Sequence, residues 1–313
     1  MAESNHNDGL TLTVLGCGTM GNAILGGIMA ALNDPAGPSK PDEVVPPRLP
    51  SRFVACDAWS GAPEAIKSAL GKYNKPLEVF VNDNLSGAQK ADIILLACKP
   101  HMFNEILTAP GMREALQGKL LMSILAGVHA NQIERALYPD GLPENACRVV
   151  RVMPATTALV RESMTVISQP TPPLSDAHTQ LVTWIFNRVG KVVHLPPYLM
   201  DASTALCGSG PAFVALVLEA MADGAVAMGI PRKEAQLMAA QTMKGTTSLV
   251  LEENRHPAVL RDMVSTPGGC TIAGLCSLEE GGVRGQVSRA IREATTVASQ
   301  LGQGKQGVNG TRH

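Results

Sequence analysis

One segment near the amino terminus constrains the fold of this chain more than any other. Residues 11–15, TLTVL, are short, β-branched and apolar, and they run directly into the glycine-rich residues 16–21, GCGTMG. Apolar residues then recur at helical spacing from Ile24 to Leu32. A strand, a G-x-G-x-x-G turn and a helix in this order form the context in which a dinucleotide pyrophosphate is bound. The sequence therefore predicts an α/β fold that begins with a Rossmann-type dinucleotide-binding domain.

Each position of the glycine turn has an expected role in that domain. Gly16 makes the tight turn, Gly18 lets the backbone approach the pyrophosphate, and Gly21 lets the helix touch the strand. Thr19 and Met20 lie between these glycines, at the start of the helix, and belong to the same candidate cofactor site. The alternative is a glycine-rich turn that binds no ligand.

The second predicted strand, residues 52–56, ends in an acidic residue, Asp57. An acid at this point usually accepts hydrogen bonds from the adenosine ribose, and it follows the glycines by about 20 residues. Asp57 lies further from Gly21 than that, and the proline-rich loop of residues 33–51 accounts for the excess. In that role Asp57 would repel a 2′-phosphate and favour NADH. If Asp57 is instead a helix cap, Ser60, Arg52 and Lys67 are left to receive a 2′-phosphate. The choice between NADPH and NADH then stays open.

Strands continue to alternate with helices up to residue 195. Further strands are predicted at residues 77–81, 91–98, 120–125, 148–152, 164–167 and 191–194. In the segment 91–98, ADIILLAC, residues 93–98 are continuously apolar, which is typical of a parallel strand that is buried on both faces. Ligands of open α/β sheets bind beyond the carboxyl ends of the strands, so Lys99 is a candidate cofactor-binding residue. We place the dinucleotide-binding domain at residues 10–195.

The rest of the chain is predicted to be entirely helical. From Ala212 to Met228 the sequence is apolar on nearly every face of a helix and rich in small residues. A helix of this kind must be buried all round, and one small helical domain can hardly enclose it. We therefore expect an all-helical dimerisation and substrate domain at residues 196–302 that forms a homodimer, followed by a disordered tail at residues 303–313. Glu219 and Asp223, near the middle of the apolar helix, argue against a membrane span.

Composition narrows the class of partners. The chain carries 26 Lys+Arg against 27 Asp+Glu, and its net charge of −1 provides no broad basic field for nucleic acid. Seven scattered cysteines, with no C-x-x-C pair and no histidine cluster, indicate reduced thiols and no metal site. The polar amino terminus shows no targeting pattern, so we expect a cytoplasmic protein whose partner is a small molecule.

A second glycine-containing loop stands out in the helical half. A predicted helix at residues 257–264 is stopped by Pro267 and two glycines, and a new apolar-periodic helix starts at Thr271. Free amides at the start of a helix bind anions with the help of the helix dipole, and Ser265, Thr266 and Thr271 add three hydroxyls. The alternative is an ordinary, well-capped turn between two helices.

Several of these motifs together resemble a known family, pyrroline-5-carboxylate reductase. They are residues 16–21, Lys99-Pro100-His101, and residues 206–213 (LCGSGPAF), 222–224 (ADG), 228–232 (MGIPR) and 257–279. The likeness covers residues 10–300, and its STPGGCT loop is highly specific. The resemblance implies reduction of the cyclic imine 1-pyrroline-5-carboxylate to L-proline with NADPH or NADH, the last step of proline biosynthesis. It also implies a Rossmann domain followed by a helical dimerisation domain, and it allows assemblies larger than a dimer.

The resemblance also assigns roles to individual residues. The glycine turn holds the pyrophosphate, and Ala97, Cys98 and Lys99 line the cofactor. The substrate loop comprises Ser265, Gly268, Gly269, Cys270 and Thr271. We hypothesise that the substrate carboxylate accepts bonds from the amides of residues 269–271 and from the Ser265 hydroxyl, while the Thr271 hydroxyl orients the ring nitrogen. Ser265 and Thr271 are therefore the candidate catalytic residues.

One strand end departs from the family pattern. The family usually reads Met-Pro-Asn-Thr-Pro where this chain has Met153-Pro154-Ala155-Thr156-Thr157. An amide side chain and a rigid proline are therefore missing where the resemblance places the active site. The departure leaves two alternatives open. One is a reductase of another cyclic imine or ketimine acid, and the other is a catalytically silent NAD(P)-binding paralogue.

Overall fold

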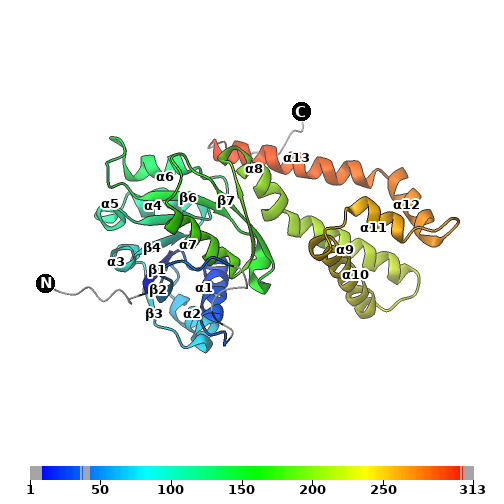
Figure 1. The fold of residues 1–313 in the computed structure, drawn as a ribbon, viewed down its shortest axis with the longest axis horizontal. Coiled ribbons are helices and arrows are strands. Elements are labelled where there is room, and N and C mark those ends of the chain that lie inside the picture. Colours follow the sequence, from blue (N-terminus) through cyan, green and yellow to red (C-terminus); the bar gives the residue numbers. More distant parts are fainter. Residues whose placement is uncertain (1–8, 36, 38–42, 304, 306–313) are drawn as a thin grey trace. The chain divides into compact units, whose positions relative to one another are not determined.

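The computed structural model describes residues 9–35, 37, 43–303 and 305, and it divides the chain into two compact units. The first unit holds the chain up to Gly208 together with the segment from Thr295 onward, and the second unit holds Ser209–Ala294. The first unit contains the sheet, and the second consists of helices (Figure 1). The tail expected at residues 303–313 lies outside the described residues, apart from Gln303 and Lys305.

The first unit is built on one eight-stranded sheet with the order β3-β2-β1-β4-β5-β6-β7-β8. The strands are β1 (Leu10–Leu15), β2 (Pro50–Asp57), β3 (Leu77–Val81), β4 (Ile93–Leu96), β5 (Leu120–Ser123), β6 (Arg148–Met153), β7 (Ser163–Ser168) and β8 (Gly190–Leu195). Strands β1 to β6 are parallel, β7 runs antiparallel to β6, and β8 is parallel to β7. The strand order reverses between β1 and β4, which is the switch point where open α/β sheets bind ligands.

All eight predicted strands are present, and the predicted fold class is confirmed. The largest difference is at β4, which ends at Leu96 although the apolar run continues to Cys98. The chain leaves the sheet there because the backbone of Cys98 turns to pack against Gly16 in the loop after β1. The loop after β4 and the loop after β1 are thereby held together at one edge of the sheet.

Helices and single turns connect the strands. In the first unit they are α1 (Thr19–Ala31), α2 (Ala62–Leu70), η1 (Gly71–Tyr73), α3 (Asn84–Lys90), η2 (Pro100–Met102), α4 (Phe103–Leu107), α5 (Met112–Leu116), α6 (Ala130–Leu137), η3 (Thr156–Val160), α7 (Asp176–Asn187), η4 (Pro197–Leu199), α8 (Met200–Ser203) and η5 (Thr204–Gly208). The helices that follow are α9 (Gly210–Ala227), α10 (Arg232–Glu252), α11 (Pro257–Met263), α12 (Cys270–Glu280) and α13 (Val283–Gly302).

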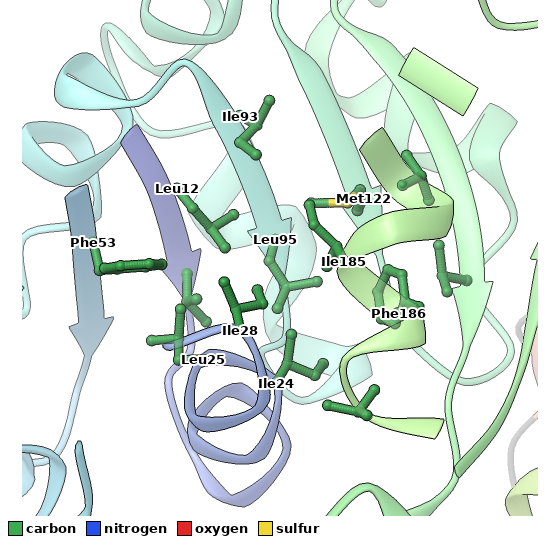
Figure 2. Close-up of a cluster of buried hydrophobic side chains, with 14 of the residues drawn as sticks. Leu12, Ile24, Leu25, Ile28, Phe53, Ile93, Leu95, Met122, Ile185 and Phe186 are labelled. Carbon is green, nitrogen blue, oxygen red and sulfur yellow. The ribbon is translucent and has the colours of Figure 1, made fainter. Parts of the chain in front are cut away.

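Both faces of the sheet are covered by apolar packing. On one face, Ile24 and Ile28 of α1 and Phe186 of α7 gather around Leu12 and Leu95 (Figure 2). The opposite face is closed by α3, α4, α5 and α6, whose buried residues include Ala88, Leu107, Met112 and Ile133. Burial on both faces explains why the central strand β4 is apolar throughout.

The second unit buries far less of its apolar surface. Helices α9 and α10 meet through small residues, and Ala222 is the one buried residue of α9. Leu216 of α9 is 66% exposed, and Met228 at its end is 85% exposed. By length and composition alone, the helical segment Pro197–Ala227 could cross a membrane, and only 11% of its most apolar stretch is buried. The apolar helix expected to need a covering partner is therefore present and uncovered in the single chain.

The division between the units differs from the one expected between residues 195 and 196. Packing carries the first unit on to Gly208, because Met200 of α8 is buried against Met153 and Val166 of the sheet. The end of α13 also belongs to the first unit, since Gly302 lies against Gly127 and His129. Hydrophobicity along the sequence could not reveal this return of the last helix.

Candidate cofactor and substrate sites

The glycine turn joins the ends of three strands. The amides of Gly16 and Cys17 both donate to the carbonyl of Cys56 at 2.9 Å, which fixes the turn to the end of β2. Gly16 has φ +85°, and a Cβ atom there would lie 2.5 Å from the backbone of Cys98. Only glycine satisfies both the left-handed backbone and this close approach. Gly21 is constrained by packing alone, because a Cβ atom there would meet the side chain of Val14 in β1 at 2.9 Å.

The start of α1 offers unpaired backbone donors. The first helical bond comes from the amide of Asn22 to the carbonyl of Gly18 at 3.0 Å, so the amides of Thr19, Met20 and Gly21 precede the helical ladder. Gly18 caps the helix without a side-chain bond, and a Cβ atom there would meet nothing within 4 Å. Open space, free amides and the positive end of a 13-residue helix fit a dinucleotide pyrophosphate.

Asn22 is a residue of this turn that the sequence analysis missed. Its side-chain nitrogen donates to the carbonyls of Cys17 and Gly18, both at 3.0 Å, and thereby holds the turn in shape. Its Oδ1 atom is buried and has no hydrogen-bond partner among the described residues. A bound ligand that donates a hydrogen bond would satisfy this atom. The signal was its position directly after the third glycine.

The loops after β2 and β4 present Asp57 and Lys99 beside the glycine turn. Asp57 is half-buried, and its Oδ1 atom accepts a hydrogen bond from the amide of Trp59 at 2.9 Å. Helix α2 begins at Ala62 with Gly61 as its cap, so Asp57 does not cap that helix. The amide of Ala97 donates to the carbonyl of Leu15 at 2.8 Å, and Lys99 beyond it is exposed.

Cys98 sits in this site as a packing residue. Burial raises the pKa of its thiol to about 11, which keeps it protonated and unreactive near neutral pH. Burial likewise raises the pKa of Cys56 to about 12. The thiols of Cys56, near the end of β2, and of Cys98, in the loop after β4, are therefore unreactive. Cys98 can contribute only its backbone and bulk to a bound cofactor.

The strand end that departs from the family pattern is tightly built. Ala155 is buried, and its amide donates to the hydroxyl of Ser163 at 2.9 Å. That hydroxyl is in turn 3.1 Å from the hydroxyl of Thr165. Thr157 follows within the 3-10 turn η3. Hydrogen bonds from β7 therefore hold this strand end, although the family's amide side chain is absent.

The substrate loop begins where α11 ends. The Ser265 hydroxyl donates to the carbonyl of Arg261 at 2.7 Å, and its backbone amide donates to the carbonyl of Asp262 at 3.1 Å. Gly268 has φ +67°, a conformation that favours glycine. The side chain of Ser265 thus secures the loop to the preceding helix. In this arrangement its hydroxyl proton is already engaged, which differs from the role as a carboxylate donor in our hypothesis.

The start of α12 carries the free amides. The amide of Gly269 is bonded to the carbonyl of Thr266 at 3.0 Å, so it is not one of the expected carboxylate donors. The first helical bond comes from the amide of Ala273 to the carbonyl of Gly269, which leaves the amides of Cys270, Thr271 and Ile272 at the open end. Gly269 caps the helix without a side-chain bond, and Cys270 is exposed. The anion-binding end predicted for this helix has therefore shifted by one residue.

A buried polar cluster was also missed. Arg151 of β6 is 5% exposed, its NH1 atom is 3.3 Å from Nδ1 of His129, and its NH2 atom is 3.7 Å from Oδ1 of Asp201. This cluster ties the loop after β5 and helix α8 to the sheet. A charged residue inside the apolar strand RVVRVM was the available signal. Among the described residues, no group of three or more His, Cys, Asp or Glu side chains could hold a metal ion.

Comparison with known protein families identifies both halves of the chain. A model described as pyrroline-5-carboxylate reductase dimerisation matches residues 197–301. A second model, described as NADP oxidoreductase coenzyme F420-dependent, matches residues 11–127. The first match contains the loop before α12, and the second contains the glycine turn.

Whole-chain relatives agree with these matches. The chain is 57% identical to a pyrroline-5-carboxylate reductase of Lophium arboricola and 53% identical to one of Neurospora crassa, in each case over 97% of both chains. Among solved structures, it is similar to a Coxiella burnetii pyrroline-5-carboxylate reductase, with a TM-score of 0.77, 27% identity and coverage of 94 and 99% of the two chains. A Plasmodium falciparum pyrroline carboxylate reductase with NADP bound gives a TM-score of 0.74, 27% identity and coverage of 94 and 98%. This chain therefore belongs to the pyrroline-5-carboxylate reductase family.

Proposed function

We propose that this protein reduces 1-pyrroline-5-carboxylate to L-proline with NADPH or NADH, as the last step of proline biosynthesis. The observation that carries the proposal is the open amino-terminal end of α12, where the amides of Cys270 and Thr271 are available for a carboxylate. The names of the relatives, which share more than half of the sequence, support the same substrate.

The first unit has the parts that a dinucleotide needs. When bound, the nicotinamide supplies the hydride for the reduction. The amides of Thr19, Met20 and Gly21 bind the pyrophosphate, and the open space above Gly18 admits it. Lys99 beyond β4 adds a positive charge at the same edge of the sheet.

The second unit holds the substrate. The substrate carboxylate accepts hydrogen bonds from the amides of Cys270 and Thr271 at the positive end of α12. Thr271 is a half-buried residue, and its hydroxyl orients the imine nitrogen. Ser265 acts by holding the loop through its bond to Arg261. A protonated imine is already electrophilic, so positioning and electrostatics supply most of the rate.

We further propose that the enzyme is a cytoplasmic homodimer that assembles through its helical unit, has no nucleic-acid or membrane partner, and can build larger assemblies from this dimer. The exposed apolar face of α9 supports assembly, as does the dimerisation model that covers the whole segment 197–301. The balanced charge of 26 Lys+Arg and 27 Asp+Glu speaks against nucleic acid. Burial of α9 between two copies also accounts for its apolar length without a membrane.

The decisive experiment is steady-state oxidation of NADH and NADPH by the purified chain in the presence of 1-pyrroline-5-carboxylate. Piperideine-type and open-chain ketimine acids are tested beside it, because Ala155 replaces the usual amide in the family pattern. Preferred turnover of 1-pyrroline-5-carboxylate supports the proposal. Preferred turnover of another imine would reassign the substrate. Cofactor binding without turnover of any imine would indicate a silent paralogue.

A further inference from the structure

The adenosine end of the candidate cofactor site is formed by the loop after β2. The register of β1 and β2 pairs Leu15 with Cys56, so Asp57 at the end of β2 lies beside Gly16. The Asp57 carboxylate uses Oδ1 to accept the bond from Trp59, and no bond to Oδ2 is made by any described residue. A half-buried carboxylate oxygen thus remains available next to the pyrophosphate-binding turn.

Cations that could receive a 2′-phosphate are directed elsewhere. Arg52 lies near the opposite end of β2, where its guanidinium donates to Thr11 Oγ1 and to the carbonyl of Gly9, both at 3.0 Å. Lys67 is in the last turn of α2, and five residues of helix place it about 7 Å along the axis from Ala62. Lys99 follows β4, and β1 lies between β4 and β2 in the sheet. Lys99 is therefore two strands away from the loop after β2, where a 2′-phosphate would lie.

The start of α2 is also poorly suited to hold a phosphate. The amide of Ala62 is already bonded to the carbonyl of Trp59 at 3.0 Å, and Pro63 has no amide hydrogen. The next residue, Glu64, carries a negative charge in the first turn. A helix start normally attracts anions through its free amides, and this one has lost most of that capacity.

Trp59 provides a flat apolar surface at the same position. Trp59 lies two residues after Asp57 in the sequence, and it is 62% exposed. The indole ring packs directly over Gly61, where any Cβ atom would collide with it. Glycine at position 61 therefore lets the ring lie against the backbone while much of its surface remains open for stacking with a heteroaromatic base.

From these four observations we propose that this enzyme prefers NADH over NADPH. Asp57 accepts hydrogen bonds from the adenosine ribose hydroxyls and repels a 2′-phosphate, and Trp59 stacks on the adenine ring. This inference rests on the proposed function, which identifies the cofactor as NADPH or NADH. It adds which of the two is preferred and the physical reason. The bound NADP in the Plasmodium falciparum relative belongs to a chain that is only 27% identical.

The test is calorimetric titration of the full-length protein with NADH and with NADPH, without any imine. We expect NADH to bind at least about tenfold more tightly, the size of effect that one like-charge contact produces. Asp57→Asn keeps an oxygen for the amide of Trp59 but removes the charge, and it should narrow that ratio by about tenfold. Trp59→Ala should lower the affinity for NADH and the affinity for NADPH by the same factor, because both cofactors carry adenine.

Lys67→Ala is the matched control, and it should leave the ratio unchanged. Equal or tighter binding of NADPH by the natural sequence would overturn the proposal, as would an unchanged ratio in Asp57→Asn. A loss of NADPH affinity in Lys67→Ala would also contradict it. Since binding is measured without substrate, a failure to reduce 1-pyrroline-5-carboxylate would count against the proposed reaction and leave the measured cofactor preference standing.

Discussion

The two units of this chain treat their apolar residues in opposite ways. In the first unit, both faces of the sheet are covered, and large side chains such as Trp184 and Leu12 are completely buried. In the second unit, the buried apolar residues are three alanines and Leu260, while Leu216 and Met228 remain mostly exposed. Burial of a large apolar side chain contributes about 1.5–3 kcal/mol to folding, so apolar burial within one chain stabilises the first unit far more than the second.

The difference shows that the two units of one chain differ in how much of their apolar surface is buried within that chain. The first unit has its core within a single chain, and the second unit leaves much of its apolar surface exposed in the single chain. The family's dimerisation model covers this same surface, from residue 197 to 301. Both tryptophans, Trp59 and Trp184, lie in the first unit, so their fluorescence reports on that unit alone. The contrast can therefore be measured unit by unit.

The largest expected effect comes from placing a charge on the exposed face of α9. Leu216→Asp should dissociate the dimer, because the change occurs twice in a symmetric interface and removes about 3–6 kcal/mol of apolar burial. Light scattering over a dilution series measures the dissociation constant. Far-ultraviolet circular dichroism should show loss of helix, while the fluorescence of Trp184 stays native.

The control for that experiment is Leu142→Asp in the first unit. Leu142 is 59% exposed, close to the 66% of Leu216, but it lies in the loop after α6. We expect no change in assembly from this variant. An unchanged dimer dissociation constant in Leu216→Asp would show that the apolar face of α9 is not the interface, and it would contradict the contrast drawn between the two units.

The next effect is on the core of the first unit. Ile28 of α1 is completely buried in the apolar cluster between the helix and the sheet (Figure 2). Ile28→Ala should lower the free energy of unfolding by about 2–5 kcal/mol, and Ile28→Val by only about 0.5–1.5 kcal/mol. Urea titration followed by tryptophan fluorescence measures both. The dimer dissociation constant should not change, and a change there would show that the two units are not independent.

Much of the first unit could be predicted from sequence because its signals are local. Every strand was found, since each is a short segment rich in apolar and β-branched residues that lies between helical segments or turns. The direction of β7 was not predicted. Only residues 154–162 separate β6 from β7, which is too short for a parallel crossover and therefore requires an antiparallel return.

The sequence predicted which residues form the candidate site, but it did not predict all of the hydrogen bonds that these residues make. The glycine turn and the 265–271 loop were located correctly as free helix starts. The engagement of the Gly269 amide by Thr266, and of the Ser265 hydroxyl by Arg261, depends on backbone angles that no pattern specifies. Asn22 was missed because its role is to satisfy carbonyls of a turn whose shape must be known first.

A smaller effect is expected in the second unit from the candidate catalytic hydroxyl. Thr271→Val keeps the branched shape and the backbone amide but removes the hydroxyl that orients the imine. Turnover of 1-pyrroline-5-carboxylate should fall at least about tenfold, as for other positioned hydrogen-bonding groups. Calorimetric affinity for the cofactor should be unchanged, because the cofactor residues belong to the first unit.

Ser265→Ala is the companion variant. It removes the bond to the carbonyl of Arg261, and so it should loosen the loop and raise KM more than it lowers kcat. Unchanged turnover in Thr271→Val would remove Thr271 from the mechanism. A larger loss of kcat in Ser265→Ala than in Thr271→Val would restore Ser265 as the direct donor to the substrate.

The smallest effect is that of acid on the first unit. Burial, followed by the charge of Arg148, lowers the pKa of His178, and burial lowers the pKa of His194, whose Nε2 atom is 2.9 Å from the hydroxyl of Thr183. Because the folded pKa values lie below the unfolded value of about 6.5, the unfolded chain binds more protons as the pH falls. This contribution to stability is therefore present above the unfolded pKa and is lost as the pH falls toward the folded pKa. Urea midpoints followed by tryptophan fluorescence should decrease over that window.

The double variant His178→Gln, His194→Gln tests whether these two side chains cause the acid effect. Glutamine does not titrate, so the urea midpoint of the variant should depend less on pH than that of the natural sequence. The dimer dissociation constant should change little over the same window, because both histidines lie in the first unit. An equally steep pH dependence in the double variant would assign the acid sensitivity to other groups. A dimer dissociation constant that changes strongly with pH, together with a urea midpoint that does not, would place the acid sensitivity in the helical unit.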